Sequence, residues 1–121
     1  TWSIPTVNKE LPGPACQASI MRLNENEILF LNPAVHHAGG FNLWTRKNLT
    51  LRLSRDDGQT WITSRTLNEG LSGYSDLAVK KNGQILCVFE NGKRDYCEKI
   101  SIACIKKSWL KAKEKLKDLK K

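Results

Sequence analysis

The sequence predicts an all-β fold of short antiparallel strands, followed by a short C-terminal α-helix. Three observations predict the strands. Apolar and polar residues alternate over 49–53, which is the period-2 pattern of a half-buried strand. The Asp-Asp-Gly run at 56–58 then predicts a turn, because aspartate side chains bond nearby backbone N–H groups and glycine tolerates positive φ. Residues 26–32 are echoed by residues 83–89, which predicts a repeated structural unit.

Taken in order, the chain reads as one strand after another. The expected strands span residues 2–7, 17–23, 27–32, 48–54, 60–67, 75–79, 84–90 and 99–105. Polar turns at 24–26 and 81–83 and a loop at 33–45 separate several of them. Short strands repeated in this way predict about two four-stranded antiparallel propeller blades. The chain would supply a last strand, then one whole blade, then three strands of another.

The octapeptide at 54–61 has the pattern Ser-x-Asp-x-Gly-x-x-Trp, in which the tryptophan is placed to fold its indole over the turn. It resembles the Asp-box (BNR repeat) of sialidases. The match holds at every defining position: Ser54, Asp56, Gly58 and Trp61. This resemblance implies part of a six-bladed β-propeller over residues 1–105, corresponding to the final third of such an enzyme. It also implies that the Asp-box lies on the outer rim of the propeller and has a structural role. The residues at 48–52 are most similar to those of the animal lysosomal type.

The same resemblance assigns roles to two residues near the Asp-box. The run at 42–53 looks like the segment that delivers the third arginine of the substrate-carboxylate clamp, which implies that Arg46 binds substrate. An arginine suits a carboxylate because its planar fork donates two parallel charge-assisted bonds. The run at 73–77 looks like the segment of the catalytic tyrosine, which implies that Tyr74 is the nucleophile. Without the resemblance, Arg46 would be a solvated surface arginine and Tyr74 a buried aromatic at a strand start.

Glu90 ends an apolar strand and resembles the glutamate that orients and charge-compensates the first clamp arginine, so the resemblance implies a catalytic role for it too. Its alternative is a strand-end carboxylate in water. The first two clamp arginines, the acid/base aspartate and the glutamate that activates the tyrosine have no match in this sequence. Arg52, which alternates with leucines, and Arg55, which lies in the turn, are both expected to face solvent.

Neither a metal site nor a cofactor is expected. The four cysteines contain no C-x-x-C pair, and His36 and His37 are adjacent instead of spaced as ligands. Cys16 and Cys87 lie in apolar runs and are expected to be buried thiols. Cys97 and Cys104 could pair, so the redox compartment stays open. The resemblance favours a lysosomal or extracellular location.

The net charge of +8 is concentrated at the end of the chain. Residues 106–121 hold eight lysines against Glu114 and Asp118, so this tail carries +6 and the rest only +2. The tail predicts a basic amphipathic helix, with Trp109, Ala112, Leu116 and Leu119 on one face. It would be a packed or solvated terminal helix, or it would contact an anionic membrane. A nucleic-acid partner is not expected, because the strands lack the basic and exposed aromatic residues that it would need.

Together these observations predict the C-terminal portion of an exo-α-sialidase, a glycoside hydrolase that removes terminal sialic acid from sialylated glycans with retention. The first residue is not Met and no signal peptide is visible, so a longer protein is expected. Residues 1–121 alone should be inactive, because they lack the acid/base and most of the clamp. The alternative is a non-catalytic Asp-box propeller that binds carbohydrate or protein. Arg46, Tyr74 and Glu90 favour the enzyme, since such a binding propeller needs none of them.

Overall fold

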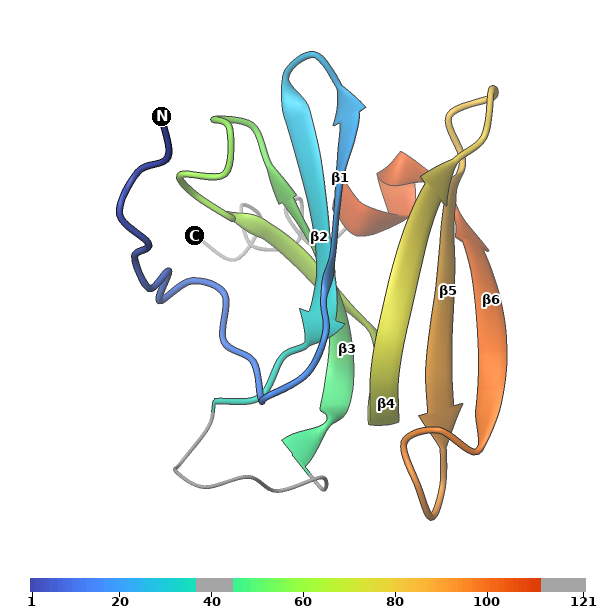
Figure 1. Cartoon of the computed structure of the whole chain (residues 1–121). Coiled ribbons are helices and arrows are strands. Elements are labelled where there is room, and N and C mark those ends of the chain that lie inside the picture. The colour runs from blue at the N-terminus through green and yellow to red at the C-terminus, as the bar shows by residue number, and fades with distance from the viewer. Residues whose placement is uncertain (37–44, 112–121) are drawn as a thin grey trace, which may run out of the picture.

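The computed structural model describes residues 1–36 and 45–111 (Figure 1). The described residues form a six-stranded antiparallel sheet in which each strand pairs with its neighbours in the sequence. The strands are β1 (Ser19–Asn24), β2 (Glu27–Pro33), β3 (Lys47–Ser54), β4 (Thr63–Val79), β5 (Ile85–Gly92) and β6 (Lys99–Ile105). The all-β prediction is confirmed.

The long strand β4 divides this sheet into two units. It spans 17 residues and pairs with β3 up to Leu71, then with β5 from Leu71 onward. Figure 1 shows its two halves running in different directions. The first half completes a four-stranded unit with β1, β2 and β3, and the second half forms a three-stranded unit with β5 and β6. One whole blade followed by three strands of another was the expected arrangement, and the sheet is consistent with part of a β-propeller.

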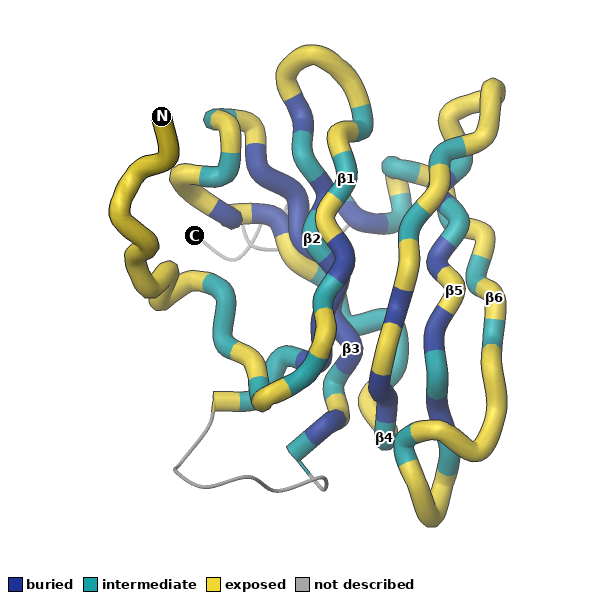
Figure 2. Tube along the Cα trace, viewed as in Figure 1, coloured by how far each residue is buried: buried dark blue, intermediate teal, exposed yellow. Residues whose placement is uncertain are grey.

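The core lies between the two units. Alternate residues of β3 and β5 point inward, as the period of a strand requires, and Figure 2 shows the buried positions on these strands. The buried apolar residues are Leu29, Leu31, Leu49, Leu51, Leu53, Ile85, Cys87, Phe89 and Leu110. Each fully buried leucine contributes about 1.5–3 kcal/mol to folding, so this cluster holds the two units together.

The helix that follows β6 closes one end of this core. Within the described part of the chain it spans residues 107–111, and its Leu110 is fully buried. The Arg65 guanidinium lies 4.2 Å from the centroid of the Trp109 ring and donates a hydrogen bond of 2.7 Å to the Trp109 carbonyl. The expected apolar face left out Leu110, which proves to be the buried residue. The expectations for Ala112, Leu116 and Leu119 lie outside the described residues.

Glu27 fastens the same helix from the β1–β2 side. Its buried carboxylate pairs with Lys107, with Lys111 at 3.9 Å and with Arg55 at 3.5 Å. Burial alone would raise the pKa of Glu27, but the hydrogen bonds from Lys107 and Asn24 and the lysine charges outweigh it, so that pKa lies below its ordinary value. Lysines of the basic tail therefore pair with the folded sheet.

Three expectations are corrected by the structure. Residues 2–7 form no strand, and Trp2 is 99% exposed, because no neighbouring strand of the described chain pairs with this segment. Residues 63–67 of the strand expected at 60–67, and the whole strand expected at 75–79, belong to the single bent strand β4, and residues 60–62 are in no strand. Arg52 is buried instead of solvent-facing, since β3 is covered on both sides. Its guanidinium donates to Asn32 Oδ1 at 2.9 Å, and burial lowers its pKa.

For the cysteines and Arg55, the structure agrees more closely with the expectations from the sequence. All four cysteines are free thiols, so Cys97 and Cys104 are not paired. Cys87 is buried, and burial raises its pKa to about 11, whereas Cys16 is only half-buried. Arg55 is exposed, as expected. No helix in residues 1–36 and 45–111 is long and apolar enough to cross a membrane.

Candidate functional site

A β-bulge in β4 brings the candidate residues together. Ser72 pairs with Asn91 and Ser75 with Phe89, so two residues of β4, Gly73 and Tyr74, lie opposite the single residue Glu90 of β5. A bulge of this kind bends its strand and re-aims the side chain that it carries. Here it turns the Tyr74 ring outward, leaving that residue 52% exposed.

Arg46 reaches the bulge from the start of β3. Its carbonyl accepts a hydrogen bond of 2.8 Å from the N–H of Ser72, which aligns the two strands just before Tyr74. The Arg46 residue is only 8% exposed, and its Nη2 donates to the Ala15 carbonyl at 2.8 Å. The guanidinium carbon lies 5.7 Å from the centroid of the Tyr74 ring. Arg46 is therefore a held, nearly buried cation beside Tyr74 and not a solvated surface arginine.

Glu90 contacts the tyrosine segment directly. One of its carboxylate oxygens, Oε2, accepts a hydrogen bond of 2.9 Å from the N–H of Tyr74. Gly73 makes this approach possible, because a Cβ at that position would lie 2.4 Å from Oε2 of Glu90. The glycine that precedes the tyrosine is therefore required by the close packing of the site.

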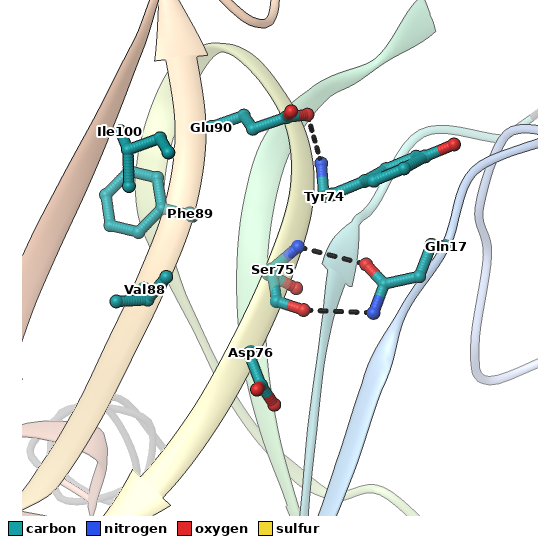
Figure 3. Close-up of a pocket in the computed structure, with 8 residues that line it drawn as sticks. All are labelled: Gln17, Tyr74, Ser75, Asp76, Val88, Phe89, Glu90 and Ile100. Carbon is teal, nitrogen blue, oxygen red and sulfur yellow. Dashed lines mark hydrogen bonds between the residues drawn. The ribbon is translucent and has the colours of Figure 1, made fainter.

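Gln17 holds the other side of the tyrosine segment. Its Nε2 donates to the Ser75 carbonyl at 2.9 Å, and the Ser75 N–H donates to its Oε1 at 3.0 Å. Figure 3 shows Glu90 and Gln17 each bonded to the β4 backbone, one at Tyr74 and the other at Ser75. The nearby Ser19 hydroxyl also donates to the Ser75 carbonyl, at 2.6 Å. The backbone at Tyr74 and Ser75 is thus fixed by Glu90 of β5 and by Gln17, which lies just before β1.

An open cavity of about 520 Å³ lies beside this segment. Its apolar side comes from Val88, Phe89 and Ile100 (Figure 3). Its polar lining comes from Gln17, Tyr74, Ser75, Asp76 and Glu90. In the described residues, no group of three His, Cys, Asp or Glu side chains is placed to hold a metal ion. The described His36 is exposed, and His37 lies outside the described residues.

Tyr96 is a further member of the site that the sequence analysis missed. It lies in the β5–β6 loop, and the Arg46 guanidinium carbon is 4.7 Å from its ring centroid. The sequence analysis also missed Gln17. Neither residue stands in a motif, and both depend on contacts between segments far apart in the sequence. The run of polar and charged residues at 91–99, directly after Glu90, is the one signal that marked the Tyr96 loop.

The residues of the expected Asp-box, 54–61, lie at the opposite end of β3 from Arg46. The Ser54 hydroxyl bonds to Asp56 Oδ1 at 2.7 Å and accepts from the Gly58 N–H at 2.8 Å. Thr60 donates to Asp56 through its N–H at 2.8 Å and its hydroxyl at 2.6 Å. The Trp61 indole is 93% covered and donates to the Gly58 carbonyl, as the folded-back hairpin requires. An eight-residue strand is about 26 Å long, so this turn is remote from Tyr74.

Comparison with known proteins adds one similarity. No family model matches the chain. A sialidase from Micromonospora viridifaciens is 31% identical in an alignment over 96 residues that covers 72% of this chain. The similarity supports a sialidase-like family. This chain spans only 14% of the length of that sialidase.

The geometry of the site shows which chemical groups it presents to a ligand. Arg46 supplies a fixed positive charge, Tyr74 a half-exposed hydroxyl, and Glu90 a carboxylate that holds the backbone between them. A guanidinium can bind an anionic group of a ligand, and the half-exposed phenol beside it can contact the same ligand. The sequence resemblance named Arg46, Tyr74 and Glu90 as candidates for one site, and in the structure these three residues lie close together.

Proposed function

We propose that this chain is the C-terminal portion of an exo-α-sialidase, closest to the animal lysosomal type and carrying an Asp-box at 54–61. The observation that carries the proposal is the convergence of Arg46, Tyr74 and Glu90 at one bulge. They come from three segments of the chain, and a propeller that only binds glycans has no need of a nucleophile beside a buried arginine. The substrate class is a sialylated glycan, and the reaction is hydrolysis of the terminal sialic acid.

Arg46 is proposed to bind the carboxylate of the sialic acid. Its low exposure matters, because a guanidinium withdrawn from water forms stronger bonds to a carboxylate than a solvated one. The bond to the Ala15 carbonyl and the nearby Tyr74 ring hold its orientation before any substrate arrives. The Arg46 side chain therefore loses little conformational entropy when substrate binds.

Tyr74 is proposed to be the nucleophile. Its hydroxyl oxygen would attack the anomeric carbon while the bond to the leaving oxygen breaks, and water would later release the sugar with retained configuration. A neutral phenol suits this role, because a carboxylate nucleophile would be repelled by the carboxylate of the substrate. Glu90 would hold the Tyr74 backbone and balance the charge of a clamp arginine from elsewhere in the enzyme.

The remaining parts of the reaction are proposed to come from outside this chain. They are the proton donor for the leaving oxygen, the base for Tyr74 and two clamp arginines, so residues 1–121 alone would be inactive. No cofactor is proposed. A lysosomal or extracellular location is proposed from the resemblance. Contact of the basic tail with an anionic membrane stays a prediction, and two of the tail's lysines, Lys107 and Lys111, already pair with Glu27.

The test uses the complete enzyme and a fluorinated sialic acid that accumulates as the covalent intermediate. Mass spectrometry should find the label on the peptide that contains Tyr74, and Tyr74→Phe should abolish it. Tyr96→Phe, which removes a neighbouring hydroxyl, is the matched control and should still trap the label. Label on the same peptide of Tyr74→Phe would refute the assignment. A wild-type protein that binds sialosides without turnover or labelling would favour the non-catalytic propeller.

A further inference from the structure

The Arg46 guanidinium lies over two aromatic rings, and the closer ring is that of Tyr96. Its guanidinium carbon is 4.7 Å from the Tyr96 centroid and 5.7 Å from the Tyr74 centroid. A cation within about 6 Å of a ring centroid is attracted by the electron-rich face of the ring. Tyr96 therefore stabilises Arg46 without using the hydrogen-bonding directions in the plane of the guanidinium.

The loop that carries Tyr96 is held in one conformation. The Glu98 carboxylate accepts hydrogen bonds from the backbone N–H groups of Lys93, Arg94 and Asp95, at 2.9, 2.8 and 3.1 Å. These backbone bonds, led by those from Lys93 and Arg94, lower the pKa of Glu98 below its ordinary value. The Tyr96 ring is thus placed by a loop with its own internal support.

Tyr96 also packs against the backbone just before the proposed nucleophile. A Cβ at Gly73 would lie 2.5 Å from Cδ2 of the Tyr96 ring, a distance that side chains do not tolerate. Only glycine allows the ring this close. Tyr96 therefore touches both the segment of Tyr74 and the guanidinium of Arg46, which come from different strands.

We propose that Tyr96 is a positioning residue that fixes the guanidinium plane of Arg46 for the carboxylate of the substrate. The inference rests on the proposed function, since it assigns Tyr96 to the same site. A bidentate bond needs the guanidinium and the carboxylate in one plane. A ring centroid 4.7 Å from the guanidinium carbon restricts the orientations that the guanidinium can take before substrate binds. The aromatic ring, and not the hydroxyl, makes this contact, so a phenylalanine at position 96 should orient Arg46 equally well.

The first arm of the test needs no substrate. In residues 1–121 labelled for NMR, the ring current of Tyr96 should shift the side-chain resonances of Arg46 upfield. Tyr96→Leu should move them back toward the values of a free arginine, and Tyr96→Phe should leave them in place. The same spectra hold an internal reference, because Arg65 lies over Trp109 at 4.2 Å and should not respond. Arg46 resonances that ignore Tyr96→Leu would overturn the proposal.

The second arm measures kinetics in the complete enzyme. Tyr96→Leu should raise KM on the order of tenfold and change kcat less, whereas Tyr96→Phe should match the wild type. If Tyr96→Leu does not fold, Gly73→Ala displaces the ring from the other side and should move the same Arg46 resonances. An unchanged KM in a folded Tyr96→Leu enzyme would overturn the binding role. A wild-type enzyme without turnover would instead refute the proposed function, and the NMR arm would still decide the position of Arg46.

Discussion

The two ends of β3 are built in different ways. At the end that leads into the turn at 54–61, each hydrogen bond of Asp56 joins it to a residue within four positions. At the other end, Arg46 meets Ala15, Tyr74 and Tyr96, which lie up to 50 positions away in the sequence. The hydrogen bonds of Asp56 are therefore local, although Trp61 at the end of the turn also contacts Glu10 and Phe30. The site around Tyr74, by contrast, exists only when the sheet has formed.

This contrast explains which substitutions should affect stability and which should affect function. A change in the turn removes local bonds and lowers stability, but it leaves the distant pairing of β4 and β5 intact. A change at the bulge alters how three separate segments meet. The first two predictions below test that separation with pairs of like residues, one from each end, and the last compares two aspartates of the turn.

The largest effect is expected for the arginines. Arg46→Lys in the complete enzyme should lower kcat/KM on the order of a hundredfold, because an ammonium cannot form the bidentate bond and leaves the carboxylate poorly paired. Arg55→Lys, in the exposed turn, is the matched control and should change kcat/KM by less than about twofold, since Arg55 is remote from Tyr74 and a lysine keeps the positive charge that faces Glu27 at 3.5 Å. Steady-state kinetics on a sialoside decides. Equal losses for both variants would show that the two ends are not separable.

The next largest difference is expected between alanine substitutions at the two glycines Gly73 and Gly58. Gly73→Ala places a Cβ against Glu90 and Tyr96, so it should cost about 1–3 kcal/mol of stability and most of the activity. Gly58→Ala meets no close contact but holds φ at +85°, so it should cost about 1–2 kcal/mol from backbone strain alone and spare the activity of the folded enzyme. Thermal melting and kinetics on the same samples check both. A fully active Gly73→Ala enzyme would remove the close-packing argument.

The difference between the two ends also sets how much could be predicted from the sequence. The turn itself could be predicted from Ser54, Asp56 and Gly58, because its hydrogen bonds join neighbours in the chain. The contacts of Trp61 with Glu10 and Phe30 could not, because they join distant segments. Arg52 was placed in solvent because alternation cannot show that both faces of a central strand are covered. The strand expected at 2–7 needed a partner strand that the described chain does not offer. Tyr96 was missed for a similar reason, since its place depends on Gly73 and Glu98 and not on a motif.

The smallest effect is expected at Asp56. Hydrogen bonds from the Thr60 hydroxyl, the Thr60 N–H and the Ser54 hydroxyl hold the pKa of Asp56 at about 2. Because the pKa of an unfolded aspartate is higher, near 3.9, the folded state favours the charged form. Asp56 therefore contributes stability that is fully present above about pH 4 and is lost as the pH falls through about 2.

Asp56→Asn removes this titration. At pH 7 it should lower the melting temperature by several degrees, and the gap to the wild type should narrow as the pH falls from 4 to 2. Asp57→Asn is the control, because Asp57 makes only an exposed ion pair with Arg22 at 3.0 Å and should matter little. Neither change should alter KM in the complete enzyme, since the turn is remote from Tyr74. A large rise in KM for Asp56→Asn at an unaltered melting temperature would mean that the turn at 54–61 takes part in binding, and the proposed separation of a structural end and a functional end of β3 would fail.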